Sequence, residues 1–250
     1  MKTRILFMLA GLVIGAYLGG FLSSQTIFVY SEYPHEDNFY ATFIEPESIN
    51  GSVTSILVPA VDSKGEGVAT TLLVQVEKGS GKMLVNIDKL LFWTDTQTSI
   101  RTASEVAQKV TGKDLSKYDI IYTIKADAMV IEGPSAGAAL TVATIAALEG
   151  WEPKSDVMIT VTINPDGTIG RVGGILQKAE AAKSTGARIF LVPDTQSNTT
   201  VFRSKRTCQN YGFTQICSVQ QFPEQVNIQE ETGITVNEVS TIDDALEFFR

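Results

Sequence analysis

The sequence predicts an α/β domain of the α+β kind, with a mixed β-sheet, preceded by one apolar helix. Two observations lead to the domain: strand-like and helix-like segments alternate after Gly51, and hairpin-type turns occur among the helical crossovers. A third leads to the helix, because residues 5–22 contain no charged residue. We expect a signal anchor or signal peptide at 1–25, a linker at 26–51 and a globular domain at 52–250.

The composition excludes several classes of protein. Hydrophobic residues make up 44% of the 250 residues and charged residues 19%, which is typical of a chain with a packed core. The 20 basic and 28 acidic residues give a net charge of −8, whereas nucleic-acid-binding domains are basic, so we expect no nucleic-acid partner. The predicted domain uses most of the chain, so we also expect no ATP-driven module.

Residues 5–22 predict a segment that enters a membrane. As a helix they would span about 27 Å at 1.5 Å per residue, close to the roughly 30 Å of a bilayer core. Lys2 and Arg4 precede the run and the next charge is Glu32, so we expect the bulk of the chain outside the cytoplasm. We favour an uncleaved anchor. A signal peptide cleaved near Leu22, which would leave a secreted domain, stays open.

The cysteines fit an oxidising compartment. Cys208 and Cys217 are the two cysteines, and a bridge between them would contribute about 2–3 kcal/mol on the chain-entropy model. Two unpaired thiols fit the sequence equally well. With one histidine, His35, and no CxxC pair, we expect no metal site. Asn50 and Asn198 stand in glycosylation acceptor patterns.

The first half of the domain predicts a strand-rich sheet and two helices. Strands are expected where β-branched and apolar residues lie between turn residues, at Val53–Val61, Val68–Val76, Met83–Ile87 and Tyr118–Ile124. The glycines at 79–81 are expected to turn the second strand directly back into the third. Helical periodicity predicts one helix at Thr96–Val110 and a second at Ser135–Leu148, ended by Gly150.

The second half predicts further alternation. Strands are expected at Val157–Ile163, Arg188–Val192, Phe213–Val219 and Ile234–Val239. Helices are expected at Gly174–Ser184, around Thr200–Gln209 and at the C-terminus. The last helix should begin after Thr241, because Asp244 follows three residues later in a capping pattern.

The segment Gly133-Pro134-Ser135-Ala136-Gly137 contains a candidate nucleophile. Its Gly-Pro turn brings Ser135 to the first turn of a helix, where free backbone N–H groups and the positive end of the helix dipole surround the hydroxyl. An oxyanion beside a serine nucleophile would be stabilised there. On this segment alone, a helix-capping serine is the simpler interpretation.

A serine nucleophile needs a base, and Lys178 is the candidate. The residues three and four positions away on its helix, Gly174, Ile175, Ala181 and Ala182, are all small or apolar. Burial on this face would lower the pKa of the lysine from about 10.4. The same position fits a lysine whose aliphatic stem extends to water.

Together these two segments resemble the proteolytic domain of Lon-type peptidases. Lys178, in Gly173-Gly174-Ile175-Leu176-Gln177-Lys178, follows Ser135 by 43 residues, and the likeness covers residues 52–250. The resemblance implies the family's fold (ribosomal protein S5 domain 2-like), with Ser135 as nucleophile and Lys178 as general base. It also implies supporting positions at Thr160, whose hydroxyl would approach the lysine amine, and at Glu132, Gly133 and Ala136.

Two departures from the family shape the functional expectation. Lon enzymes carry an ATPase module that we do not expect here, and the segment Thr195–Gln221 is longer than its family counterpart. We therefore expect an ATP-independent serine endopeptidase with a Ser-Lys dyad, without a cofactor, that cleaves peptides or unfolded proteins outside the cytoplasm. A catalytically silent binding or assembly module at the membrane is the alternative. The resemblance also implies a hexameric ring.

Overall fold

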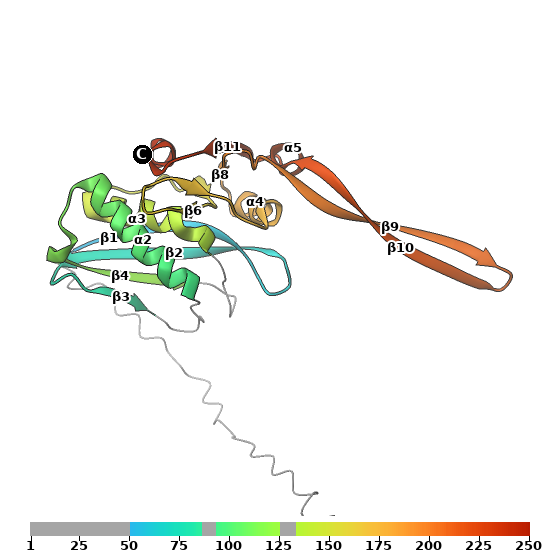
Figure 1. Cartoon of the computed structure of the whole chain (residues 1–250), viewed down its shortest axis with the longest axis horizontal. Coiled ribbons are helices and arrows are strands. Elements are labelled where there is room, and N and C mark those ends of the chain that lie inside the picture. Colours follow the sequence, from blue (N-terminus) through green and yellow to red (C-terminus); the bar gives the residue numbers. More distant parts are fainter. Residues whose placement is uncertain (1–50, 87–93, 126–133) are drawn as a thin grey trace, which may run out of the picture. The chain divides into compact units, whose positions relative to one another are not determined.

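The computed structural model describes residues 51–86, 94–125 and 134–250 (Figure 1). The chain divides into two compact units, Met1–Glu45 and Pro46–Arg250, and all of the described residues belong to the second. The apolar segment predicted at 1–25, nearly all of the linker at 26–51, and Asn50 therefore lie outside the described residues. None of the helices within the described ranges is long and apolar enough to cross a membrane.

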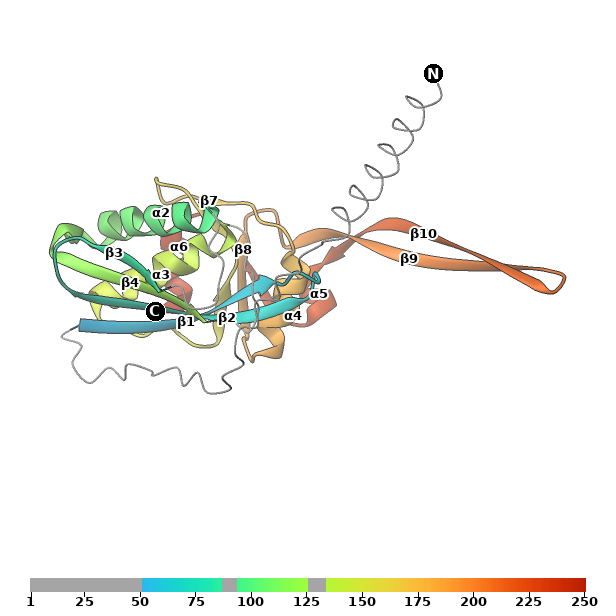
Figure 2. The ribbon, with the colours of Figure 1, turned by 90° about the horizontal axis from the view of Figure 1, so that it is seen from below.

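A four-stranded mixed sheet forms the first layer of this unit. Its strands are β1 (Gly51–Val61), β2 (Gly67–Lys78), β3 (Met83–Asn86) and β4 (Tyr118–Lys125), in the order β1-β2-β4-β3. β2 is antiparallel to β1 and β4, and β3 is parallel to β4. Two helices, α2 (Thr94–Thr111) and α3 (Gly137–Glu149), lie over one face of this sheet (Figure 2). The predicted positions of these strands and helices are confirmed.

The predicted hairpin between the second and third strands is wrong, because β4 lies between β2 and β3. The carboxylate of Asp119, at the start of β4, accepts hydrogen bonds from the backbone N–H groups of Ser80 and Lys82, at 2.7 and 2.8 Å. The glycine-rich turn is therefore wrapped around the first residues of β4. The chain leaves the turn on the far side of β4, where Met83 pairs with Ile120.

A second, three-stranded parallel sheet completes the unit. Its strands are β5 (Val157–Ile159), β8 (Ile189–Pro193) and β11 (Thr235–Val239), in the order β11-β8-β5. The connecting helices and short strands are β6 (Thr162–Ile163), β7 (Ile169–Gly170), α4 (Ile175–Ser184), α5 (Ile228–Thr232) and α6 (Ile242–Phe249). The strand predicted at Val157–Ile163 is thus split into β5 and β6. The predicted cap of the last helix is confirmed, since Thr241 and Asp244 form a capping box.

Two apolar clusters hold these elements together. The larger one joins the buried faces of β1, β2 and β4 to α2, α3 and α6, and contains the fully buried Tyr122 and Phe249. The smaller one lies around α4, β8 and α5, and contains Phe190 and Ile228. A mixed-sheet α/β fold, as predicted, is the result.

The helix predicted around Thr200–Gln209 is wrong. β9 (Asn198–Tyr211) and β10 (Thr214–Asn227) form a long antiparallel hairpin instead, which extends away from the other strands (Figures 1 and 2). A two-residue turn, Gly212-Phe213, joins them. A helix here would have no apolar stripe to bury, whereas β-branched and aromatic residues along both segments favour strands.

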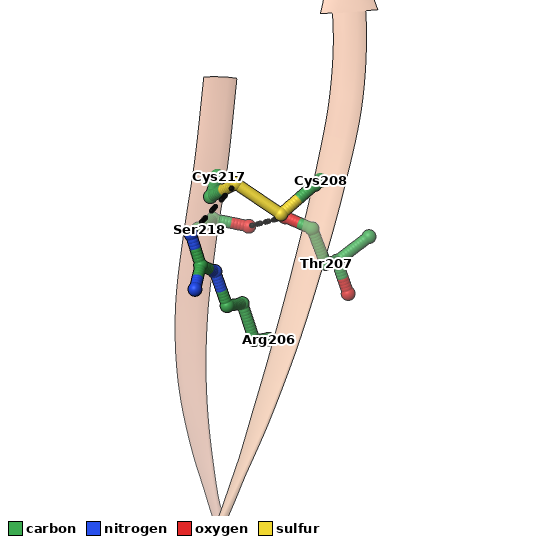
Figure 3. Close-up of a disulfide and its surroundings, with 5 residues drawn as sticks. All are labelled: Arg206, Thr207, Cys208, Cys217 and Ser218. Carbon is green, nitrogen blue, oxygen red and sulfur yellow. Dashed lines mark hydrogen bonds between the residues drawn. A yellow bond between two sulfur atoms is a disulfide. The ribbon is translucent and has the colours of Figure 1, made fainter. Parts of the chain in front are cut away.

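The hairpin carries the disulfide that the sequence left open. Cys208 and Cys217 lie directly opposite each other and are bonded, with their Cα atoms 4.0 Å apart (Figure 3). The guanidinium of Arg206 donates to the sulfur of Cys217 at 3.4 Å. The cross-link therefore fixes the register of the two strands near their turn.

Candidate active site

Ser135 lies in the short 3₁₀ turn Pro134–Ala136 that leads into α3. The N-cap of α3 is Ala136, which has no side-chain capping bond, so Ser135 does not cap this helix. The helix begins close against β6, because a Cβ atom on Gly137 would lie 2.8 Å from a methyl carbon of Ile163. The serine hydroxyl is thus left free for another partner at a helix N-terminus.

That partner is Lys178 on α4. Its Nζ donates to Oγ of Ser135 at 2.9 Å, although the two residues are 43 positions apart in sequence. Lys178 is only 6% exposed, which confirms that it lies on the buried face of its helix. Burial penalises the ammonium form and lowers the pKa of Lys178 to about 8. Lys178 is therefore neutral in a substantial fraction of the molecules at mildly alkaline pH.

The position of α4 depends on a glycine in β2. A Cβ atom on Gly67 would lie 1.9 Å from the carbonyl oxygen of Gln177, the residue before Lys178. Real Cβ atoms never approach a backbone oxygen so closely, so any other residue at position 67 would displace the strand or the helix. The sequence indicates the start of a strand at this position, but not the helix that packs against it.

A pocket of about 470 Å³ opens beside the two side chains. This is within the range of small-molecule and side-chain binding sites. Its lining residues are Val61, Asp62, Pro134, Ser135, Thr162, Arg171, Val172, Gly173, Gly174 and Lys178. Charges of both signs are therefore present, and backbone hydrogen bonds, first from Glu66, lower the pKa of the Asp62 carboxyl and keep it ionised.

A second layer of side chains fixes one wall of this pocket. Gln196, which is buried, accepts from the backbone N–H of Val172 through Oε1 and donates to its carbonyl through Nε2, both at 3.0 Å. Arg171 donates to the hydroxyl of the adjacent Thr195 at 3.3 Å. The loop at 194–197, which carries Thr195 and Gln196, is held by Glu238, whose carboxylate accepts a hydrogen bond from the N–H of Ser197 at 2.8 Å.

Sequence reasoning missed Gln196. The available signal was its position just after β8, at the carboxyl end of a parallel strand, where α/β folds place their site loops. Glu238 had no comparable signal, because its importance depends on the pairing of β11 with β8.

The remaining predicted site residues have different positions. Thr160 follows β5 and is fully buried, and its hydroxyl has no hydrogen-bond partner within the described ranges. Its backbone N–H donates to the carbonyl of Leu191 on β8. Ala136 lies half-buried in the turn that carries Ser135. Glu132 and Gly133 lie outside the described residues.

Comparison with known proteins gives a consistent result. Residues 47–205 match the sequence model of the Lon protease (S16) C-terminal proteolytic domain. The chain is 30% identical over 162 residues to the Archaeal Lon protease of Thermoplasma acidophilum, which covers 62% of this chain and 24% of that protein. It is 31% identical over 160 residues to Lon protease 2 of Syntrophobacter fumaroxidans, covering 58% and 20% respectively. The chain thus spans a quarter or less of these relatives' length.

Proposed function

Because the chain belongs to the Lon protease (S16) family through its proteolytic domain, we propose that it is a serine endopeptidase whose nucleophile is Ser135 and whose general base is Lys178. One observation carries the proposal: the amine of a buried lysine lies 2.9 Å from a serine hydroxyl at the edge of a pocket. A serine next to a desolvated lysine is a known alternative to the Ser-His pair.

The proposed reaction proceeds through an acyl-enzyme. Neutral Lys178 takes the proton of the Ser135 hydroxyl as Oγ attacks the scissile carbonyl carbon. The tetrahedral intermediate collapses, the C–N bond breaks, and the lysine ammonium gives its proton to the departing amine. A water molecule then attacks the ester, again with Lys178 as base, which releases the carboxylate product and restores the hydroxyl of Ser135.

Backbone N–H groups would stabilise the oxyanion of both tetrahedral intermediates. The candidates are those of Ser135 and Ala136, because the N-terminus of α3 has no side-chain cap that competes for them, and, on the family resemblance, that of Gly133. Pro134 has no N–H to contribute.

We assign Thr160 a supporting role. Its buried hydroxyl lacks a partner among the described residues, so it remains able to accept a hydrogen bond from the lysine amine. Such a bond would orient the lone pair of Lys178 toward Ser135. Glu132 is kept as a further supporting position on the family resemblance.

The substrates we propose are peptides and unfolded polypeptides, and the cleavage itself uses no nucleotide. The reaction above is completed by Ser135, Lys178 and water alone. We place the domain outside the cytoplasm, held by residues 5–22 or secreted after cleavage there. The disulfide between Cys208 and Cys217 supports this location, since such bonds persist in oxidising compartments.

The test compares three variants with the intact chain, on a short fluorogenic peptide and on an unfolded protein, with and without ATP and Mg²⁺. Ser135→Ala and Lys178→Met should each abolish cleavage of both substrates, with unchanged far-ultraviolet circular dichroism. Lys183→Met, an exposed lysine on the same helix, should leave cleavage intact. Full activity of either dyad variant would refute the mechanism, and a strict need for ATP would refute the nucleotide-independent reaction.

The proposed location has its own test. A thiol-reactive reagent that does not cross membranes should label a single cysteine introduced at exposed Lys154 in intact cells that produce the full chain. Labelling only after the cells are lysed would place the domain inside.

A further inference from the structure

The hairpin of residues 198–227, called here the arm, carries most of the exposed apolar side chains. Nine large hydrophobic residues are exposed in the described part of the chain, and six of them are in the arm. These six are Phe202, Tyr211, Phe213, Ile216, Val219 and Phe222. Phe213, in the turn, is fully exposed. By register, Tyr211, Ile216 and Phe222 lie on one face of the arm and Phe202 and Val219 on the other, so both faces offer apolar side chains to a partner.

The arm also has two open strand edges. Within the described residues, β9 pairs with β10 and with no other strand. Cys208 and Cys217 have the short Cα separation, 4.0 Å, of a pair without mutual hydrogen bonds, so their N–H groups point outward. By alternation, the same holds for Ser204 and Gln221, which also lie opposite each other. Both edges therefore offer free donors and acceptors to an added strand.

The chemistry of the arm favours a polypeptide over other partners. From Thr207 to Pro223 no residue is charged, so this part attracts neither an anionic surface nor nucleic acid. The charged residues lie nearer the base of the arm: Arg203 is paired with Glu224 and Glu231, and Lys205 and Arg206 follow it. A bilayer core would leave the open strand edges without partners, which lipids do not tolerate. An extended apolar peptide satisfies both the edges and the side chains.

The base of the arm adjoins the candidate active site at two points. β9 begins two residues after Gln196, whose side chain holds Val172 in the pocket wall. β10 continues directly into α5, and α5 packs against α4, which carries Lys178. The two ends of the arm are therefore linked to the pocket wall and to the helix that carries Lys178.

We propose that the arm captures extended, apolar segments of unfolded polypeptide by strand addition and by contact with its aromatic and aliphatic side chains. This inference rests on the proposed peptidase function, and it names the arm as the substrate-recruiting surface. A polypeptide held on the arm is present at the pocket at a high effective concentration. A peptide too short to contact both the arm and the pocket does not gain this increase in effective concentration.

Two variants test the two modes of binding. The tip variant combines Tyr211→Ser, Phe213→Ser and Ile216→Ser, and removes apolar surface. The edge variant combines Ser204→Pro and Gln221→Pro, and removes one outward N–H from each edge without touching the bonds between β9 and β10. Its matched control, Ser204→Ala with Gln221→Ala, keeps both N–H groups.

Both variants should lower kcat/KM for an unfolded protein roughly tenfold through KM, and leave cleavage of a short peptide unchanged. The alanine control should match the intact chain. Equal losses on both substrates, or no loss on either, would overturn the proposal. Two other results would also overturn it: arm-dependent binding to vesicles of neutral and anionic phospholipids, or arm-dependent self-association measured by light scattering.

A binding measurement separates this inference from the proposed function. In the full chain with Ser135→Ala, a fluorescently labelled unfolded protein should bind, and the tip and edge variants should weaken that binding roughly tenfold. Binding without any cleavage by the intact chain would support the arm and refute the peptidase. Cleavage of the unfolded protein without detectable binding to the arm would do the reverse.

Discussion

The buried amine of Lys178 determines how the proposed activity depends on pH. Only its neutral form accepts a proton, and burial lowers its pKa to about 8. We therefore expect kcat/KM for a short peptide to rise as the pH increases through about 8 and to level off above it. Initial rates measured between about pH 6 and 10 test this. A flat profile across that range would contradict a lysine base.

The same burial makes Lys178 costly for folding. Between about pH 8 and 10.5 the unfolded chain holds the lysine proton while the folded chain releases it, so stability rises with pH across this window. Below about pH 8 the full cost applies. Lys178→Met should raise the free energy of unfolding by up to about 3 kcal/mol at pH 7, and by little above about pH 10.5. Urea unfolding at both pH values measures this, with Lys183→Met as the control. An equal gain at both pH values would show that desolvation of the charge is not the cause.

Gln196 is a positioning residue, because it acts on the pocket only through the backbone of Val172. Gln196→Met keeps the volume of the side chain and leaves the N–H and C=O of Val172 without partners. We expect a loss of about 1–3 kcal/mol of stability and a higher KM for a short peptide. Gln196→Glu, which can still accept from the N–H, should recover part of the KM effect. An unchanged KM in Gln196→Met would limit this residue to a structural role.

At the scale of single elements, the contact between β2 and α4 holds the lysine in place. Gly67→Ala puts a carbon against the carbonyl of Gln177, so α4 has to shift and carry the amine of Lys178 away from Ser135. We expect a loss of about 1–3 kcal/mol of stability and a large fall in kcat. Peptide cleavage and thermal unfolding measure the two effects. The neighbouring Glu66→Ala, at an exposed position, should change neither.

The sequence was sufficient for elements whose pattern is local. Apolar spacing predicts α2, and the small residues around Lys178 place this lysine on the apolar face of its helix, although a stem that extends to water fitted the same pattern. The sequence was insufficient where a residue distant in the chain determines the local structure. Asp119 holds the turn at 79–82 and redirects β3, and Gln196 reaches a backbone 24 residues away. Ser135 and Lys178 could be identified as candidates from the sequence because each lies in a short, contiguous motif.

On the scale of the whole described unit, the arm should unfold separately from the two sheets. Its residues from Arg203 to Gln225 are almost all exposed, and an isolated two-stranded hairpin is barely stable in water. The Cys208–Cys217 bridge contributes about 2–3 kcal/mol on the chain-entropy model. In the variant with Cys208→Ser and Cys217→Ser, we expect amide hydrogen exchange to accelerate in the arm and to stay unchanged in β5 and β8. A loss of protection throughout both sheets would refute separate unfolding.

The separation of 43 positions between Ser135 and Lys178 has a consequence for how such a peptidase is made. The two residues meet in the folded chain, where β5 pairs with β8 and α4 packs against β2, so their contact depends on links between distant parts of the chain. A newly synthesised, unfolded copy has a serine without a base and a lysine with an ordinary pKa. On the proposed mechanism it cannot cut its neighbours while they are unfolded and vulnerable. Folding itself then serves as the activation step, and no removable propeptide is needed to delay the reaction.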